Sequence, residues 1–456
     1  MAYTIDCDYC LSMKTKYLFL IVPILALTGT HTVFAQDELR GGAIPEVLTI
    51  DAAVNLALEN NLNLRRSALD VQTRQRSSDR SWNSLLPSIN AGVMASHPTS
   101  ITGPIEPDSR NVWTPGFSLS AGITLSTSII ENIRRAQADY ELGLLSYESA
   151  RQELELQVRK LFYQILLLDA NRELAAQNFA SAQDRYERSA ARVRVGQAPR
   201  LDELSARVDM ENLRPSVRNA ELLYENALDS FKIILGFPQE TVIRLDGSLS
   251  GAISGNLSET RTEANGSLEA ASLSKTIQSM EAQRKSIHNS AYIPNMRLSW
   301  SSMPLYTNSI LNDRSWNDNG SFSITFGLNL DNFFPWSPAR TQIENLNDNI
   351  QSVQIQLADS IRNRENRINN TIRTIERITE SLEAMRLNVD LAQSTYALHE
   401  EAYRLGAADY QQLRGAGDSL EQARYRLLQE QFNLISALLD LEKELNIPFG
   451  TLFIGE

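Results

Sequence analysis

Residues 154–168 read LELQVRKLFYQILLL, and this stretch decides the fold of the chain. Its apolar residues recur at alternating spacings of four and three: Leu154, Val158, Leu161, Ile165 and Leu168. Such heptad spacing gives a helix one apolar stripe, as in coiled coils. No proline interrupts residues 132–195, so the sequence predicts one helix of about 64 residues and about 100 Å. Because most helical stability comes from burying one face, this helix requires partner helices along its length.

The chain contains candidate partners on both sides of this stretch. Residues 199–235 follow Gly196 and residues 409–445 follow Gly406, and both segments are expected to fold back as the second helix of a hairpin. Glycine suits a left-handed helix cap, and Pro199 suits the first turn of a helix. Two more apolar stripes mark the second hairpin: Ile368, Ile372, Ile375, Ile378 and Leu382, then Leu427, Leu434, Leu438, Leu441 and Leu445. A further helix is expected over residues 51–86.

The sequence is organised as two repeats. Arg194-Val195-Gly196 is echoed by Arg404-Leu405-Gly406, and Leu235-Gly236-Phe237-Pro238 by Leu445-Asn446-Ile447-Pro448, each pair 210 residues apart. Residues 85–89 are echoed by residues 292–296, at nearly the same offset. This period is too long for a solenoid repeat and indicates a duplicated half. We therefore expect a first repeat over 36–246, a polar linker over 247–266 and a second repeat over 267–456.

Four segments alternate between apolar and polar residues, as strands do: 89–95, 117–125, 296–301 and 322–330. Their polar members are small and mostly uncharged, whereas 97–111 and 303–320 are rich in Pro, Ser, Asn and Asp and are expected to be loops. Four of the five tryptophans lie in or beside these segments, where membrane-interface aromatics are found: Trp113, Trp300, Trp316 and Trp336. A water-soluble antiparallel sheet would also alternate, so this pattern alone leaves both alternatives open.

The first 35 residues are typical of a secretory signal peptide. A basic start at residues 13–16 precedes an apolar stretch over 17–27, and Val33-Phe34-Ala35 provides small residues at a cleavage site. A transmembrane helix is the weaker interpretation, because the apolar stretch is short and contains Pro23. Residues 1–12 are expected to be an upstream extension, and they contain both cysteines, Cys7 and Cys10.

Composition and motifs exclude several classes of function. With 43 basic and 55 acidic residues, the net charge is −12, which disfavours nucleic-acid binding. After residue 35 the sequence contains no catalytic, nucleotide-binding or metal-site motif, and the four histidines of the chain do not cluster. We therefore expect no enzyme, no cofactor and no metal. After residue 35 there is no apolar run of 18 residues, but alternating strands could still cross a membrane. Four strands cannot close a barrel alone, whereas three copies would supply twelve.

Taken together, the segments resemble the TolC family of outer-membrane efflux and secretion channels, across essentially the whole mature sequence. Residues 48–53 and 56–61, residues 85–89, residues 196–202 and Tyr403-Arg404-Leu405-Gly406 carry the resemblance. The resemblance implies a mixed α+β membrane protein in which long antiparallel coiled-coil helices form a trimeric α-barrel. Four strands per chain would contribute to a 12-stranded transmembrane β-barrel in the outer membrane of a Gram-negative-type cell, and the helices would extend into the periplasm.

The resemblance also implies where partners and the gate lie. The two helix-hairpin tips would meet a periplasmic adaptor (membrane fusion protein), which is fed by an inner-membrane pump: Val195, Gly196, Gln197 and Ala198 form the first tip, and Leu405, Gly406, Ala407 and Ala408 the second. Asp202 and Tyr403 match residues that link helices in the family's closed gate. The family's arginine and two acidic residues after the second glycine are replaced by Ala408, Gln412 and Gly415, so its acidic constriction ring is not reproduced.

These features predict a homotrimeric, passive exit duct for efflux or type I secretion, in contact with outer-membrane lipid and without affinity for nucleic acid. A periplasmic or surface coiled-coil structural protein or adhesin is the alternative, because it would explain the heptads and the signal peptide. Both tip glycines could simply be helix caps. Asp202, Glu203 and Asp409 could make the duct entrance acidic, or they could be solvated carboxylates at helix N-termini.

Overall fold

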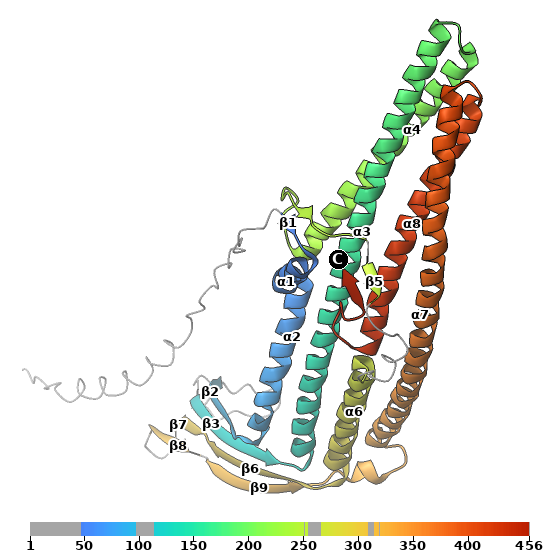
Figure 1. Ribbon diagram of the computed structural model, residues 1–456. Helices are drawn as coiled ribbons and strands as arrows, with labels where there is room; N and C mark the ends of the chain where they lie inside the picture. Colours follow the sequence, from blue (N-terminus) through green and yellow to red (C-terminus); the bar gives the residue numbers. More distant parts are fainter. Residues whose placement is uncertain are drawn as a thin grey trace, which may run out of the picture. The chain divides into compact units, whose positions relative to one another are not determined.

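A computed structural model describes residues 47–96, 114–249, 251–253, 266–308, 314–318 and 320–455. Two long helix hairpins and one curved antiparallel sheet account for most of this part of the chain (Figure 1). The expected signal peptide over residues 1–35 lies outside the described residues, and so does Trp113.

The two hairpins confirm the heptad interpretation. Helices α3 (Ser128–Arg194) and α7 (Pro338–Arg404) have 67 residues each, and they are followed by α4 (Arg200–Leu235) and α8 (Tyr410–Leu445) with 36 residues each. Each long helix packs against the helix that follows it, and α3 also packs against α8. In α3, Leu154, Val158 and Ile165 are buried, as are Phe162 and Leu167 on neighbouring faces, because α3 has partners on several sides.

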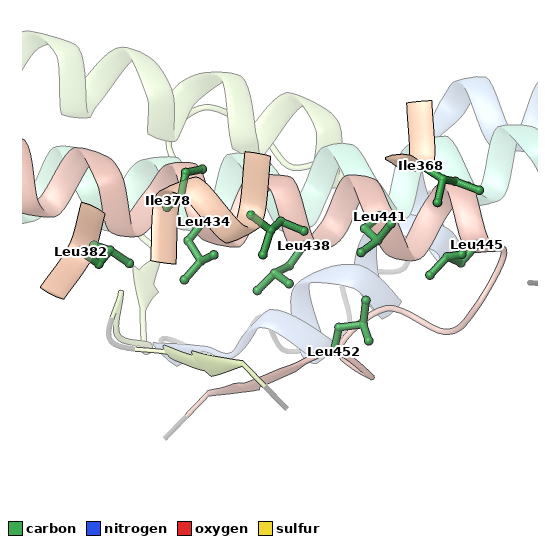
Figure 2. Packing of buried hydrophobic residues seen from close by; sticks show 9 residues of the cluster. Ile368, Ile378, Leu382, Leu434, Leu438, Leu441, Leu445 and Leu452 are labelled. Atoms are coloured by element: carbon green, nitrogen blue, oxygen red, sulfur yellow. The ribbon is translucent and has the colours of Figure 1, made fainter. Parts of the chain in front are cut away.

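The apolar stripes of the second hairpin form one core cluster. The buried members come from α7, from α8 and from the segment after α8: Ile368, Ile375, Ile378, Leu382, Leu434, Leu438, Leu441, Leu445 and Leu452. Figure 2 shows the leucines of α8 in a row beside the residues of α7, with Leu452 next to them. Full burial of one such side chain contributes about 1.5–3 kcal/mol, so this cluster stabilises the pairing of α7 with α8.

The helix expected over residues 51–86 is interrupted. The structure has α1 (Ile50–Asn60), α2 (Leu62–Asp79) and a 3₁₀ turn, η2 (Ser81–Leu85). Asn61 causes the break: its side-chain oxygen accepts hydrogen bonds from the backbone N–H groups of Asn63 and Leu64, and its amide donates to the carbonyl of Ile234 at 3.0 Å. Asparagine thus caps α2 rather than continuing α1. The remaining helix, α6 (Leu268–Tyr292), packs between α3 and α7.

Over the described residues, the sheet has six strands: β2 (Ser88–Ser96), β3 (Thr114–Leu125), β6 (Asn295–Ser302), β7 (Pro304–Asn308), β8 (Arg314–Asp318) and β9 (Ser321–Gly327). However, β6 with β7 and β8 with β9 each follow one line across it, so the sheet is four strands wide. We call each of these four rows a strand line. β3 pairs with β2 on one side and with β6 and β7 on the other, while β9 pairs with β6 and β8 with β7. Within the described residues, the outer sides of β2, β8 and β9 have no strand partner. The four predicted strands are thus present as one sheet with two open edges.

Two boundaries of this sheet differ from the sequence prediction. Residues 303–320, predicted to be a loop, contain β7 and β8, so the second strand hairpin is longer than its alternation indicated. The strand predicted to continue to residue 330 ends at Gly327, and η5 (Leu330–Phe333) follows. Asn332 holds that turn against the end of α6 by donating to the carbonyl of Ala291 at 2.9 Å.

Two pairs of short strands lie outside the main sheet. β1 (Val47–Leu48) pairs in parallel with β4 (Arg244–Leu245), and β10 (Phe453–Gly455) pairs antiparallel with β5 (Gly251–Ile253), inside the expected linker. Among the described residues, no helix is both long enough and apolar enough to span a membrane.

At the end of each helix hairpin, a charged side chain forms hydrogen bonds with the backbone of the turn that follows. After α4, Gly236 is left-handed with φ 76°, and the ammonium group of Lys232 donates to the carbonyl of Gln239 at 2.9 Å. After α8, Asn446 is left-handed with φ 55°. There the buried carboxylate of Glu442 accepts hydrogen bonds from the N–H groups of Gly450 at 2.9 Å and Leu452 at 2.7 Å.

Candidate functional site

The first tip is a glycine-terminated helix end. Gly196 adopts φ 76° and donates to the carbonyl of Val193 at 3.0 Å, while Gln197 donates to the carbonyl of Arg192 at 2.8 Å. This pair of bonds is a Schellman motif, whose left-handed position suits glycine because a Cβ is disfavoured there. The sequence prediction of a left-handed cap at Gly196 is therefore confirmed.

The second tip has the same backbone geometry. Gly406 adopts φ 78° and donates to the carbonyl of Tyr403 at 3.1 Å, and Ala407 donates to the carbonyl of Ala402 at 2.8 Å. The two tips differ in how the next helix begins. Asp409 caps α8 through a reciprocal capping box with Gln412, whereas Pro199 precedes α4 without a side-chain cap.

The eight residues expected to contact an adaptor follow the same exposure pattern in both tips. The first three residues of each tip are exposed and the fourth is partly buried: Val195, Gly196, Gln197 and Ala198, then Leu405, Gly406, Ala407 and Ala408. Val195 is 67% and Leu405 68% exposed, although both are large apolar residues. Figure 1 shows both tips at the end of the helices that lies farthest from the sheet. The contact with an adaptor stays a prediction.

The gate residue Tyr403 makes contacts between the two hairpins of one chain. Its hydroxyl forms a 2.8 Å hydrogen bond with the hydroxyl of buried Ser189, and its carbonyl accepts from Arg192 at 2.8 Å. The guanidinium of Arg192 also lies 4.9 Å from the centre of the Tyr403 ring, within cation–π range. Asp202 lies in the first turn of α4, and among the described residues no hydrogen bond joins its side chain to Tyr403. The gate role of the pair stays a prediction.

A second polar contact between the hairpins, centred on Asp209, was missed by the sequence analysis. The hydroxyl of Tyr410 in α8 donates to one carboxylate oxygen of Asp209 in α4 at 2.9 Å, and Arg414 lies 3.2 Å from the other oxygen. Burial and the Asp209 carboxylate raise the pKa of the Tyr410 hydroxyl, so this group remains a proton donor. The one sequence signal for this contact is the position of Tyr410, four residues after Gly406 and therefore close to the second tip.

An apolar cluster surrounds these polar contacts. Ala206, Tyr403, Tyr410 and Leu413 are buried together, and Tyr186 and Tyr396 pack against them. The rings of Tyr403 and Tyr410 meet edge to face, with centroids 6.2 Å apart. Because hydrogen bonds to a carboxylate are strong and this one is largely buried, the Asp209 contacts fasten the two hairpins of one chain to each other near the tips.

The sheet at the other end has two chemically different faces. Residues paired across the strands place apolar side chains on one face, and these remain exposed although they are large: Ile89, Val93, Phe117, Leu119, Trp300, Phe322, Ile324 and Phe326. The opposite face carries small polar residues, and its serines pair across strands. The hydroxyls of Ser299 and Ser323 are 2.7 Å apart, and those of Ser301 and Ser321 are 3.1 Å apart.

The predicted interface aromatics lie at different places around this sheet. Trp300 is in β6 on the apolar face and is 43% exposed, and Trp336 is 76% exposed after η5, where it stacks on Phe334 with centroids 4.9 Å apart. Trp316 is in β8, paired with Tyr306 of β7. Trp113 lies outside the described residues. In the parts of the chain that the structure describes, no group of three or more potential metal-ligating side chains was found.

Known proteins are similar to residues 53–236 in sequence and to most of the chain in fold. The sequence model of the outer membrane efflux protein family matches residues 53–236. No curated protein matches the sequence. The solved structure of the Campylobacter jejuni CmeC outer membrane channel has a TM-score of 0.75 at 14% identity, covering 88% of this chain and 86% of that chain. CusC has a TM-score of 0.73 at 15% identity, covering 88% and 92%. The open state of the Neisseria gonorrhoeae MtrE channel has a TM-score of 0.68 at 16% identity, covering 87% and 89%.

These structural likenesses confirm the predicted fold class of long helix hairpins joined to a strand sheet. The family match over residues 53–236 agrees with the resemblance that the sequence had indicated. Residues 53–236 therefore match the outer membrane efflux protein family, and the chain has the fold of solved outer-membrane channels such as CmeC, CusC and MtrE.

Proposed function

We propose that three copies of the chain form the exit duct of a tripartite efflux or type I secretion system. The two-faced sheet with open edges is the observation that carries this proposal. An exposed apolar face is costly in water but suits the hydrocarbon of a bilayer, and unpaired strand edges are not tolerated there. Joining β9 of one copy to β2 of the next would close both edges. Four strand lines per copy then give twelve strands, an even number within the known range.

The tips support a docking site for a periplasmic adaptor. Val195 and Leu405 expose apolar surface at equivalent points, and glycine next to each allows close approach of another backbone. Beside the second tip, α3 and α7 enclose a groove of about 470 Å³ lined by charged and apolar side chains, among them Arg188, Glu400 and Tyr403. Since the sequence contains no nucleotide-binding motif, we assign the energy for transport to a partner pump and treat the duct as a passive conductor.

The contacts between hairpins support a gate at this end. Ser189 with Tyr403, and Asp209 with Tyr410 and Arg414, would hold the tips of one chain together in the resting duct. Exchanging Asp209 for asparagine keeps an acceptor for Tyr410 but removes the ion pair with Arg414. We therefore expect Asp209→Asn to raise the closed-state conductance of the duct.

A matched control is available in the same helix pair. The Asp418 carboxylate lies 3.7 Å from Nε of Arg414, and its side chain is 68% exposed. Asp418→Asn therefore removes one negative charge that is in contact with water, and we expect the conductance to stay unchanged. The predicted gate pair is tested alongside, as Asp202→Ala with Tyr403→Phe. If Asp209→Asn and Asp418→Asn behave alike, the Asp209 contacts do not hold the gate.

The proposal as a whole is tested with the purified mature protein in detergent and in a planar lipid bilayer. We expect a trimer that dissociates on heating in SDS and conducts ions when inserted. A protein that stays soluble without detergent and does not insert would favour the coiled-coil structural protein or adhesin. A trimer that inserts but conducts nothing at any voltage would contradict the duct.

A further inference from the structure

Arg297 occupies an unusual position on the polar face of the sheet. It lies in β6, where it is paired with Thr124 of β3 on one side and with Thr325 of β9 on the other. This row of three residues lies near the helical end of the strands, because β6 begins directly after α6 and β3 leads into α3. Arg297 is exposed, so its guanidinium extends away from the sheet on the side of the serine pairs.

No other described residue on this face carries a charge. The residues that share the face in β2, β3, β6 and β9 are Ser, Thr, Asn, Gly and one Met: Ser88, Asn90, Gly92, Met94, Ser96, Thr114, Gly116, Ser118, Ser120, Gly122, Thr124, Asn295, Ser299, Ser301, Ser321, Ser323, Thr325 and Gly327. Arg297 also makes no ion pair with any carboxylate of the described chain. Its positive charge is therefore not neutralised locally.

The consequence depends on the trimeric duct proposed above. The polar face of the sheet must then line the lumen, because the apolar face contacts lipid. Twelve strands spaced about 4.8 Å apart and tilted by about 40° enclose a cylinder of about 12 Å radius. An extended arginine reaches about 6 Å from its Cα, so three guanidinium groups would lie about 6 Å from the axis.

We propose that three copies of Arg297 form a cationic ring inside the duct, which makes this section favour anionic solutes. Screening by salt decides whether the electrostatic potential of this ring reaches the axis of the duct. The Debye length is about 10 Å at 0.1 M salt, longer than the distance from ring to axis, but about 3 Å at 1 M. Coulomb's law in water then gives about sixfold enrichment of a monovalent anion on the axis at 0.1 M, and less than about twofold at 1 M. The ring opposes the net negative charge of the chain.

The test is the reversal potential of the wild-type trimer and of Arg297→Gln and Arg297→Glu trimers in a potassium chloride gradient. Arg340→Gln is the matched control, because Arg340 is an exposed arginine in the first turn of α7 that pairs with Glu344 at 3.0 Å. We expect the chloride-to-potassium permeability ratio to fall at least about twofold in Arg297→Gln and further in Arg297→Glu near 0.1 M salt. The differences should be much smaller near 1 M, and Arg340→Gln should behave as wild type at both salt concentrations.

Two results would overturn the inference while leaving the duct intact. One is an unchanged permeability ratio in conducting Arg297→Glu trimers, and the other is an equal shift in Arg340→Gln, which would indicate a general effect of net charge. Absence of conductance in the wild-type trimer would instead overturn the proposed function, and the cationic ring with it. Heat-dependent trimer migration of each variant establishes that the substituted chains assemble.

Discussion

Neighbouring residues of β9 should respond in opposite ways to the same substitution. Ile324 lies on the apolar face, paired with Leu298, and is 54% exposed. Ser323 lies on the polar face, and its hydroxyl is 2.7 Å from that of Ser299. If the apolar face contacts lipid and the polar face contacts water, Ile324→Arg should prevent assembly in the membrane, whereas Ser323→Arg should be tolerated.

The two substitutions differ in free energy by a margin that decides the outcome. An arginine on the lipid face of a membrane barrel costs about 2–4 kcal/mol near the bilayer midplane. Three copies of Ile324→Arg would then cost about 6–12 kcal/mol, which is comparable to the whole stability of a typical domain. Ser323→Arg loses one serine–serine hydrogen bond per chain, about 1 kcal/mol, and its charged group stays in water.

The assay is the amount of heat-modifiable trimer recovered from the outer-membrane fraction of cells that express each variant. We expect trimer for wild type and Ser323→Arg, and little or none for Ile324→Arg. Equal recovery of both variants would refute the assignment of the faces, since a sheet with water on both sides tolerates arginine at either position. Loss of Ser323→Arg alone would reverse the assignment of lipid and lumen.

Three further substitutions test the helices. Gly196→Ala should destabilise the first tip by about 1–2 kcal/mol, because alanine is strained at φ 76°, whereas Gly415→Ala inside α8 should stabilise by about 0.5–1 kcal/mol, as measured by thermal dissociation of the trimer. Leu441→Ala should cost about 2–5 kcal/mol in the same measurement, because Leu441 is fully buried. Burial raises the pKa of Glu442 above 4.5, so its contribution to stability is present at low pH and is lost as the pH rises through the raised value. The stability difference between wild type and Glu442→Gln, measured at several pH values, should shift toward wild type on acidification, and the opposite trend would show that its backbone hydrogen bonds outweigh burial.

Features with a local physical cause could be predicted from the sequence. Heptad stripes predicted α3, α7 and α8, because burying one face is what stabilises a long helix. Gly196 and Gly406 were predicted to end their helices because a left-handed residue is needed there, and both are left-handed. Alternation predicted both faces of the sheet, since a strand turns successive side chains to opposite sides.

Features that depend on distant contacts could not be predicted in the same way. Asn61 interrupts the first helix partly through a bond to Ile234, 173 residues away. The contact between Tyr410 and Asp209 joins residues 201 apart, and neither lies in a recognisable local pattern. The strands β7 and β8 were not predicted for a different reason: each has only five residues, without a sustained apolar–polar alternation, and their pairing with each other defines them.

The ends of the two helix hairpins share their backbone geometry more closely than their side-chain chemistry. Both second helices end at a left-handed residue, Gly236 and Asn446. The turn after each of these helices is held by a side chain of opposite charge. Lys232 donates a hydrogen bond to a backbone carbonyl after α4, whereas Glu442 accepts hydrogen bonds from two backbone N–H groups after α8. A turn needs its free backbone groups satisfied, but either sign of partner can do so. A left-handed residue therefore ends both helices, whereas the charged residues that hold the following turns differ between the two hairpins.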